Sequence, residues 1–283
     1  MAKKLELSNP DYPKILHSIE NPPPELWVEG DLALFNQGTK IALVGSREPT
    51  VYGKKTAFRI AKELAERGVI VVSGLAYGID TEAHRGALAG GGKTIAVLGC
   101  GINFPYPQKN LGLKQEIIRS GIVISEWPPE TPSADWTFPQ RNRIISGLSS
   151  AVVVVEAAER SGALITAEWA LSQGREVFAV PGNIDSPVSA GTNRLIQNGA
   201  TPLLSTEDLF QELKLPLSKK TFEETVSSPE ERQILDLLAE ARSVDEIVEA
   251  TGLVIEDLSS LLIHMEIDKK IRSLPGGRYE RVL

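Results

Sequence analysis

The sequence predicts an α/β protein: an extended Rossmann-like, doubly wound and mostly parallel sheet, followed by a small C-terminal winged-helix domain. Runs of β-branched and aliphatic residues begin at positions 41, 69, 94, 121, 151, 176 and 200, and a stretch with helical period follows each run. Strands this apolar are typical of parallel sheets that are buried on both faces. Beyond position 226, three short amphipathic segments precede a hairpin that Pro-Gly-Gly closes at 275–277.

Four segments of different character divide the chain. Residues 1–40 are expected to form an N-terminal cap packed on the core, because a proline triplet at 22–24 excludes a long helix. Residues 41–212 carry the seven strand patterns and form the expected Rossmann-like domain. Residues 213–226 are polar and contain turn residues, which predicts a linker. Residues 227–283 are expected to form the winged-helix domain.

The composition indicates a protein without disulfides, secretion signal or membrane span. The single cysteine, Cys100, cannot form an intrachain disulfide, and the lysines near the N-terminus have no apolar run behind them. The longest uniform apolar run, at 151–155, is far too short to cross a bilayer. We therefore expect a soluble, cytoplasmic protein. Its formal net charge of −7 excludes a wholly basic nucleic-acid binder but allows a local basic groove.

The winged-helix segment is acidic. Residues 227–283 contain seven Lys or Arg against twelve Asp or Glu, and the third helical pattern opens with Glu256 and Asp257. Duplex DNA, the usual ligand of a winged helix, would be repelled by these charges. We therefore expect this domain to contact protein, with a packing role and DNA contact as the alternatives.

The turns that follow the strands carry the predicted binding chemistry, because ligands of doubly wound sheets bind outside the carboxyl ends of the strands. Gly45, Ser46 and Arg47 end the first strand, and the arginine offers a planar fork of donors to a phosphate. Ser73 and Gly74 end the second strand just before a helix, where outward-pointing N–H groups favour an anion.

Two later turns extend this pattern. Phe138 precedes Arg141, Asn142 and Arg143 in one short segment, and cations beside aromatic rings are the combination that holds single-stranded nucleic acid. The turn 160–162, Arg-Ser-Gly, follows the fifth strand and opens another helix. Each turn taken alone is also compatible with ordinary core packing or helix capping; their repetition along one sheet edge favours a binding role.

The sequence lacks the motifs of dinucleotide, ATP-hydrolysing and metal sites. The GxGxxG dinucleotide fingerprint and the GxxxxGK[ST] phosphate loop are absent, so no nicotinamide, flavin or ATP-hydrolysing site is expected. His17, His84 and His264 lie in separate regions without a paired cysteine, which predicts no metal site and no cofactor. Glu126 and Glu156 end strands and are expected to order neighbouring loops rather than to form a catalytic pair.

The chain resembles the DNA-processing protein A family (DprA, also called Smf) between about Tyr12 and Phe210. The resemblance rests on ordered motifs: GSR at 45–47, SGLAYGIDTEAHRGAL at 73–88, YP at 106–107, SE at 125–126, FPQRNRIISGLS at 138–149, VVVEA at 153–157, SGALITA at 161–167 and VPG at 180–182. It implies a homodimeric protein that binds single-stranded DNA and loads a RecA-type recombinase onto incoming DNA in natural transformation. It implies no catalysis.

The resemblance also assigns positions. The phosphate-binding arginine of the GSR motif falls on Arg47, and the lysine after the YP pair falls on Lys109. Together, motifs and resemblance give these expected DNA-binding residues: Gly45, Ser46, Arg47, Ser73, Gly74, Lys109, Phe138, Arg141, Asn142, Arg143, Arg160, Ser161 and Gly162. The resemblance places the dimer interface near Leu195, Ile196 and Leu203.

The alternative is an enzyme similar to the cytokinin-activating phosphoribohydrolases, which belong to a related nucleotide-binding class. Those enzymes carry a PGGxGTxxE segment whose glutamate does chemistry. Here the PGN and GTNRL segments are separated, and Leu195 stands at the expected carboxylate position. General acid–base catalysis without its carboxylate is hard to support, so the non-catalytic mediator is favoured.

Overall fold

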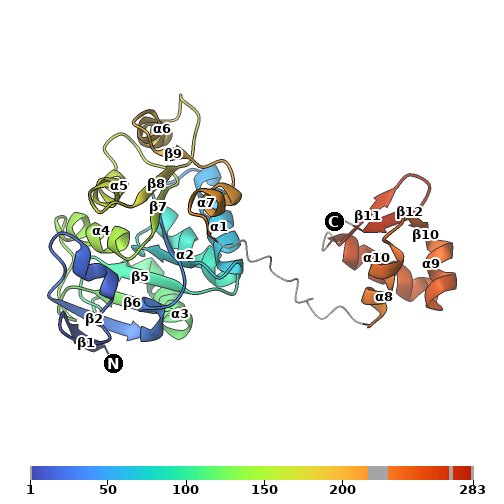
Figure 1. Cartoon of the computed structure of the whole chain (residues 1–283), viewed down its shortest axis with the longest axis horizontal. Helices are drawn as coiled ribbons and strands as arrows, with labels where there is room; N and C mark the ends of the chain where they lie inside the picture. Colours follow the sequence, from blue (N-terminus) through green and yellow to red (C-terminus); the bar gives the residue numbers. More distant parts are fainter. Residues whose placement is uncertain (1, 216–228, 268–269, 282–283) are drawn as a thin grey trace. The chain divides into compact units, whose positions relative to one another are not determined.

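The computed structural model describes residues 2–215, 229–267 and 270–281 (Figure 1). The chain divides into two compact units, Met1–Ser218 and Lys219–Leu283, which we treat separately. Most of the predicted linker 213–226 lies outside the described residues. No helix in the described ranges is both long enough and apolar enough to span a membrane.

The first unit is built on one nine-stranded sheet. All seven strands predicted from the apolar runs are present and pair in parallel. In spatial order, the sheet consists of β1 (Lys3–Glu6), β2 (Glu25–Gly30), β6 (Ile122–Ser125), β5 (Thr94–Leu98), β4 (Ile70–Ser73), β3 (Lys40–Val44), β7 (Ala151–Val154), β8 (Glu176–Ala179) and β9 (Thr201–Pro202).

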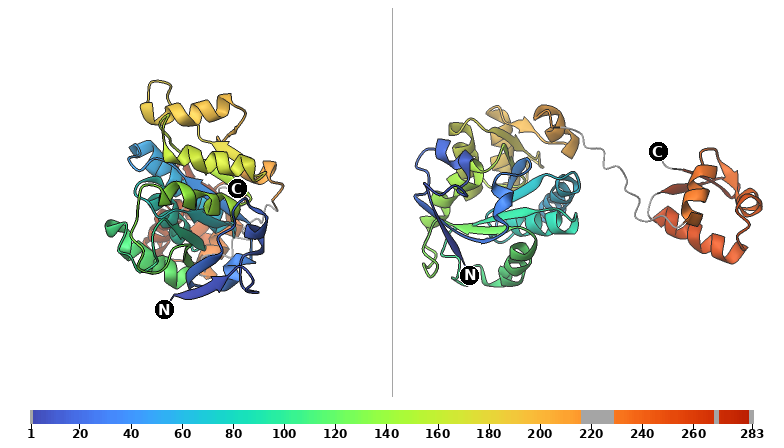
Figure 2. Two further views of the ribbon diagram at one scale, coloured as in Figure 1. Left: turned by 90° about the vertical axis from the view of Figure 1, so that its left-hand side faces the viewer. Right: turned by 60° about the horizontal axis from the view of Figure 1, so that its bottom comes forward.

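Helices cover both faces of this sheet (Figure 2), which confirms the doubly wound prediction. They are α1 (Val51–Glu66), α2 (Ile79–Ala89), α3 (Leu111–Ser120), α4 (Thr137–Gly147), α5 (Gly162–Ser172), α6 (Ala190–Gln197) and α7 (Thr206–Glu212). Alternate residues of β3 enter different cores: Ile41 and Leu43 pack with α1 and α2, whereas Ala42 and Val44 pack on the side of α4 and α5. Burial on both faces explains why the strands are so uniformly apolar.

The N-terminal cap contributes two strands, so the sheet is larger than the seven strands expected. β1 pairs antiparallel with β2, and β2 pairs antiparallel with β6. A short 3-10 helix, η1 (Lys14–Ser18), connects them and places Leu16 and Ile19 in the core beneath α4. The cap strands alternate buried and exposed side chains, which is a weaker sequence signal than a continuous apolar run.

One predicted interface residue is wrong. Leu203 is 3% exposed and belongs to the core formed with α1 and α7, because it follows β9 with its side chain turned inward. The next residue, Leu204, is 75% exposed instead. Leu195 and Ile196, on α6, are half-buried, and Leu195 packs against the core on the side of α4 and α5.

The second unit confirms the winged-helix prediction. Its helices are α8 (Pro229–Leu237), α9 (Val244–Thr251) and α10 (Ile255–Ile267), and its sheet has the order β10 (Arg242–Ser243), β12 (Arg278–Arg281) and β11 (Ile271–Leu274). Buried side chains from all three helices and from β11 form a separate core. The hairpin turn holds Gly276 and Gly277 at φ of +86° and +69°, where other residues would be strained. Glu256, expected at the start of the third helix, has a side chain outside the described set.

The neighbouring leucines 203 and 204 provide a test of this packing. We expect Leu203→Ala to lower the free energy of unfolding by about 2–5 kcal/mol, because it leaves a cavity in the core. Leu204→Ala is the matched control and should change it by less than about 0.5 kcal/mol. Urea unfolding followed by circular dichroism measures both, and equal effects would show that the two side chains are not placed as described.

Candidate nucleic-acid interface

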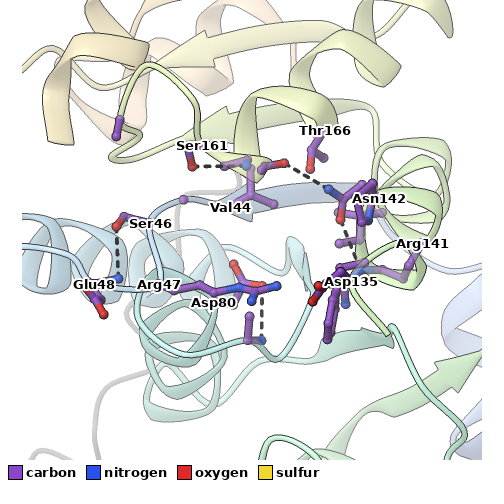
Figure 3. A pocket seen from close by; sticks show the side chains of 18 residues that line it. Val44, Ser46, Arg47, Glu48, Asp80, Asp135, Arg141, Asn142, Ser161 and Thr166 are labelled. Carbon is purple, nitrogen blue, oxygen red and sulfur yellow. Dashed lines mark hydrogen bonds between the residues drawn. The ribbon is translucent and has the colours of Figure 1, made fainter. Parts of the chain in front are cut away.

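A pocket of about 490 Å³ lies at the carboxyl edge of the sheet, where the strand order reverses (Figure 3). The chain leaves β3 toward β4 on one side, and β7 begins the other half of the sheet. Doubly wound folds bind ligands at this switch point. The pocket is lined by Val44, Gly45, Ser46, Arg47, Glu48, Ala76, Asp80, Asp135, Phe138, Pro139, Arg141, Asn142, Ile145, Ala158, Ser161, Gly162, Ala163 and Thr166.

The floor of the pocket depends on close backbone packing. Ser46 N–H donates to the carbonyl of Glu156 at 2.7 Å, and Ile79 N–H donates to the carbonyl of Ser46 at 3.1 Å. A Cβ atom on Gly45 would lie 2.7 Å from the Ile79 side chain and 2.8 Å from the Glu156 carbonyl oxygen. Glycine at this position therefore allows the turns after β3, β4 and β7 to meet.

Arg47 is the exposed cation at this pocket. Its guanidinium lies over the Phe138 ring, 4.7 Å from the centroid, and its side chain makes no ion pair or hydrogen bond within the described part of the chain. The Phe138 ring contacts Tyr106 at 5.5 Å, and Tyr106 contacts Tyr77 at 6.5 Å between centroids. This cation thus borders a row of three aromatic rings contributed by two loops and by the first turn of α4.

Arg141 lies deeper, with 3% of its surface exposed. Its Nη1 donates to the carbonyls of Gly74, at 2.7 Å, and Val97. Burial lowers the pKa of Arg141 to about 10, so the guanidinium is still charged at neutral pH. A Cβ atom on Gly74 would lie 2.4 Å from Nη2 of this arginine, which explains the glycine at the end of β4.

Asp80, in the first turn of α2, brings a buried carboxylate to the same pocket. Its Oδ2 accepts from the N–H groups of Gly74, at 3.1 Å, and Ala76, at 3.3 Å. Burial raises the pKa of this carboxyl, while the charge of Arg141 and the hydrogen bonds from Ala76, Ser73 and Gly74 oppose the shift. The pocket therefore combines guanidinium donors with carboxylate acceptors.

The N-terminus of α5 forms the opposite wall. The Ser161 side chain caps this helix by accepting from Ala163 N–H at 3.3 Å. Asn142 donates through Nδ2 to the Gly162 carbonyl at 3.1 Å, which ties α4 to α5. The partial positive charge of this helix end points to the pocket and favours an anion there.

Arg143, which was predicted to contact DNA, is buried and does not line the pocket. Its guanidinium forms a two-pronged ion pair with Glu126, with distances of 2.8 and 2.7 Å, and both side chains are 5% exposed. Its Nε donates to the Asn21 carbonyl and its Nη1 also donates to the Gln140 carbonyl. The group is engaged inside the protein, because it joins α4 to the end of β6 and to the N-terminal cap.

The remaining predicted residues divide between the interior and the surface. Ser73 is buried and donates to the Leu43 carbonyl, whereas Lys109 and Arg160 are exposed and do not line the pocket. The structure therefore gathers eight of the thirteen expected residues around one cavity: Gly45, Ser46, Arg47, Phe138, Arg141, Asn142, Ser161 and Gly162. It adds the polar residues Glu48, Asp80, Asp135 and Thr166, which the prediction missed.

The strand-end glutamates order loops, as expected. Glu156 is 2% exposed and accepts from the N–H and hydroxyl of Thr50, at 2.9 and 2.5 Å, at the start of α1. His84 bonds to Thr94 through Nδ1 at 2.7 Å rather than to Asp80, and burial lowers its pKa to about 3. Among the described residues, no group of histidine, cysteine, aspartate or glutamate is arranged to hold a metal ion.

A Rossmann-like sheet with free and buried guanidinium groups, an aromatic row and a helix N-terminus at its switch point defines an anion-binding α/β protein. Comparison with known families narrows this class. Residues 3–214 match the family model of DNA recombination-mediator protein A, and residues 218–277 match the DprA winged helix domain. The chain belongs to the DprA/Smf family.

Individual relatives agree with this assignment. The DNA processing protein DprA of Bacillus subtilis is 47% identical over 209 residues, which cover 74% of this chain and 70% of that protein. The structure of DprA from Streptococcus pneumoniae superposes with a TM-score of 0.72 and 42% identity, covering 75% and 74% of the two chains. The structure of DNA processing protein A from Helicobacter pylori, which is described in terms of its single-stranded DNA binding mode, superposes with a TM-score of 0.69. The two sequences are 31% identical, and the match covers 76% of this chain and 96% of that chain.

The buried pair between Arg143 and Glu126 provides a test of the structural role assigned to Arg143. We expect Glu126→Ala to lower the free energy of unfolding by about 3–5 kcal/mol, because it leaves the guanidinium buried and uncompensated. Glu82→Ala, which removes the partner of exposed Arg85, is the control and should cost less than about 1 kcal/mol. Similar losses in urea unfolding would contradict a structural role for the Arg143 pair.

Proposed function

We propose that this chain binds single-stranded DNA at the switch-point pocket and acts as a recombination mediator that loads a RecA-type recombinase onto incoming DNA in natural transformation. The observation that carries the proposal is the Arg47 guanidinium, which lies over the Phe138 ring at the pocket and has no ion-pair partner among the described residues. The family assignment and the DNA-binding mode named for the Helicobacter pylori relative support it.

The chemistry of the pocket suits an unpaired strand. Arg47 and the N-terminus of α5 supply positive charge for phosphates, and the rings of Phe138, Tyr106 and Tyr77 offer faces on which bases stack. Duplex DNA fits less well, because its bases are already stacked and the site is a recessed pocket rather than a helix that projects into a major groove. Lys109 and Arg160 are exposed cations that extend the proposed path of the strand.

The partner contacts lie elsewhere in this proposal. Leu195 and Ile196 on α6, which are half-buried, provide the apolar groups for a homodimer. The winged-helix unit contacts protein: Ile255 and Ile263 on α10 are 52% and 56% exposed. Between positions 243 and 268 the sequence has carboxylates but no Lys or Arg, so this surface disfavours a phosphate backbone.

The enzymatic alternative has less support. The pocket carboxylates closest to a catalytic arrangement are Asp80, which is held by backbone N–H groups, and Asp135, which is exposed. The position that carries the glutamate in phosphoribohydrolases is Leu195, half-buried on α6 and outside the pocket lining. A non-catalytic binding role therefore explains more of the site.

Removing the exposed cation tests the binding site. We expect Arg47→Ala to weaken binding of an oligothymidylate by about 1–3 kcal/mol and to reduce the salt dependence, because a phosphate contact is lost. Fluorescence anisotropy across a salt series measures both. Arg59→Ala, which removes an exposed arginine of α1 paired with Glu63, is the matched control and should bind like the parent. Unchanged affinity in Arg47→Ala would place the DNA site elsewhere.

Truncation after Ser218 tests the role of the winged helix. The first unit has its own cores, and we expect it to retain single-stranded DNA binding within about twofold, since the removed unit is acidic. The same anisotropy titration measures the effect. A large loss of affinity would assign DNA contact to the winged helix and overturn its role as a protein-binding unit.

A further inference from the structure

Two buried polar side chains face the switch-point pocket without a hydrogen-bond partner on that side. Thr166 is 1% exposed, and its hydroxyl makes no hydrogen bond within the described part of the chain. Arg141 is 3% exposed, and its Nη2 likewise has no partner among the described residues, although Nη1 and Nε do. Polar groups of buried side chains usually have a hydrogen-bond partner, so unpaired ones beside a cavity are available to a polar ligand.

The orientation of Thr166 follows from α5. It lies one helical turn after Gly162, and both residues line the pocket, so the Thr166 side chain projects from α5 on the side of the pocket (Figure 3). In many helices a threonine hydroxyl bonds the carbonyl four residues earlier. Here the Gly162 carbonyl accepts from Asn142 instead, and the Thr166 hydroxyl is left for a ligand.

The dimensions and charges of the pocket define the ligand. A volume of about 490 Å³ falls within the range of small-molecule sites and is large enough for one nucleotide unit. Arg141, Arg47 and the α5 N-terminus are donors for a phosphate, whereas Asp80 and Asp135 are acceptors for hydroxyl or amino groups. A phosphate alone has no donor groups to offer these carboxylates and would be repelled by their charge.

We infer that the pocket is a mononucleotide site: it accepts one nucleoside monophosphate, either a single unit of a bound strand or the free molecule. The inference rests on the proposed DNA-binding function, because it assigns the same pocket. It adds that one nucleotide unit is recognised on its own, with the Thr166 hydroxyl and the Arg141 guanidinium as ligand contacts.

Titration calorimetry of the full chain with thymidine 5′-monophosphate, thymidine and inorganic phosphate tests this inference, together with displacement of a fluorescent oligothymidylate. We expect the monophosphate to bind at one site per chain and to displace the oligomer, with thymidine and phosphate each at least about tenfold weaker. Thr166→Val should weaken the monophosphate about tenfold by removing one hydrogen bond to a charged group, and Thr166→Ser should retain it.

A second variant keeps the test independent of core packing. A side chain on Gly162 meets open space, and aspartate is favourable at a helix N-terminus, so Gly162→Asp should fold while repelling the phosphate. Loss of monophosphate binding in this variant supports the assignment.

The other outcomes separate the two claims. If the oligomer binds but the monophosphate does not displace it, the mononucleotide site is wrong and the DNA-binding function stands. If phosphate displaces the oligomer as well as the monophosphate does, the site recognises phosphate alone, which also overturns the inference. If neither oligomer nor monophosphate binds, the proposed function fails as well.

Discussion

Three consecutive residues of α4 hold the carboxyl edge of the sheet together, because each is a buried hydrogen-bond donor that needs an acceptor on a different neighbour. Arg141 donates to backbone carbonyls at the ends of β4 and β5, Asn142 donates to the start of α5, and Arg143 pairs with Glu126 at the end of β6. These side chains are each at most 8% exposed. Leaving a buried donor without an acceptor is energetically costly, and this cost fixes the positions of the three side chains. The pocket has its shape because all three donors find acceptors in this arrangement.

The pattern of burial explains which strands could be predicted from the sequence. The parallel strands were recognisable because burial on both faces requires uninterrupted apolar residues. β1 and β2 were not, because an antiparallel edge alternates and short alternating segments resemble loops. Leu203 and Leu204 show the same limit: adjacent residues after a two-residue strand face opposite directions, and composition alone does not say which enters the core.

The site was predictable to the extent that it depends on strand-terminal turns. Arg47 was identified because it directly follows a strand, whereas Arg141 and Arg143 looked equivalent in sequence and have different environments. Apart from the neighbouring residues Gln140 and Asn142, their partners lie 17 to 122 residues away, so no local pattern distinguishes them. Thr166 was missed because a threonine one turn into a helix is ordinary in sequence, and only the cavity beside it makes the hydroxyl notable.

The contact between Gly74 and Arg141 has an evolutionary consequence. Any Cβ at position 74 would occupy the space of the guanidinium, and any shorter residue at 141 would strand two backbone carbonyls in the interior. A substitution at either position alone therefore destabilises the protein, so no single substitution replaces this pair without a cost in stability. Divergence among descendants of this chain should accordingly be slow at both positions and correlated where it occurs.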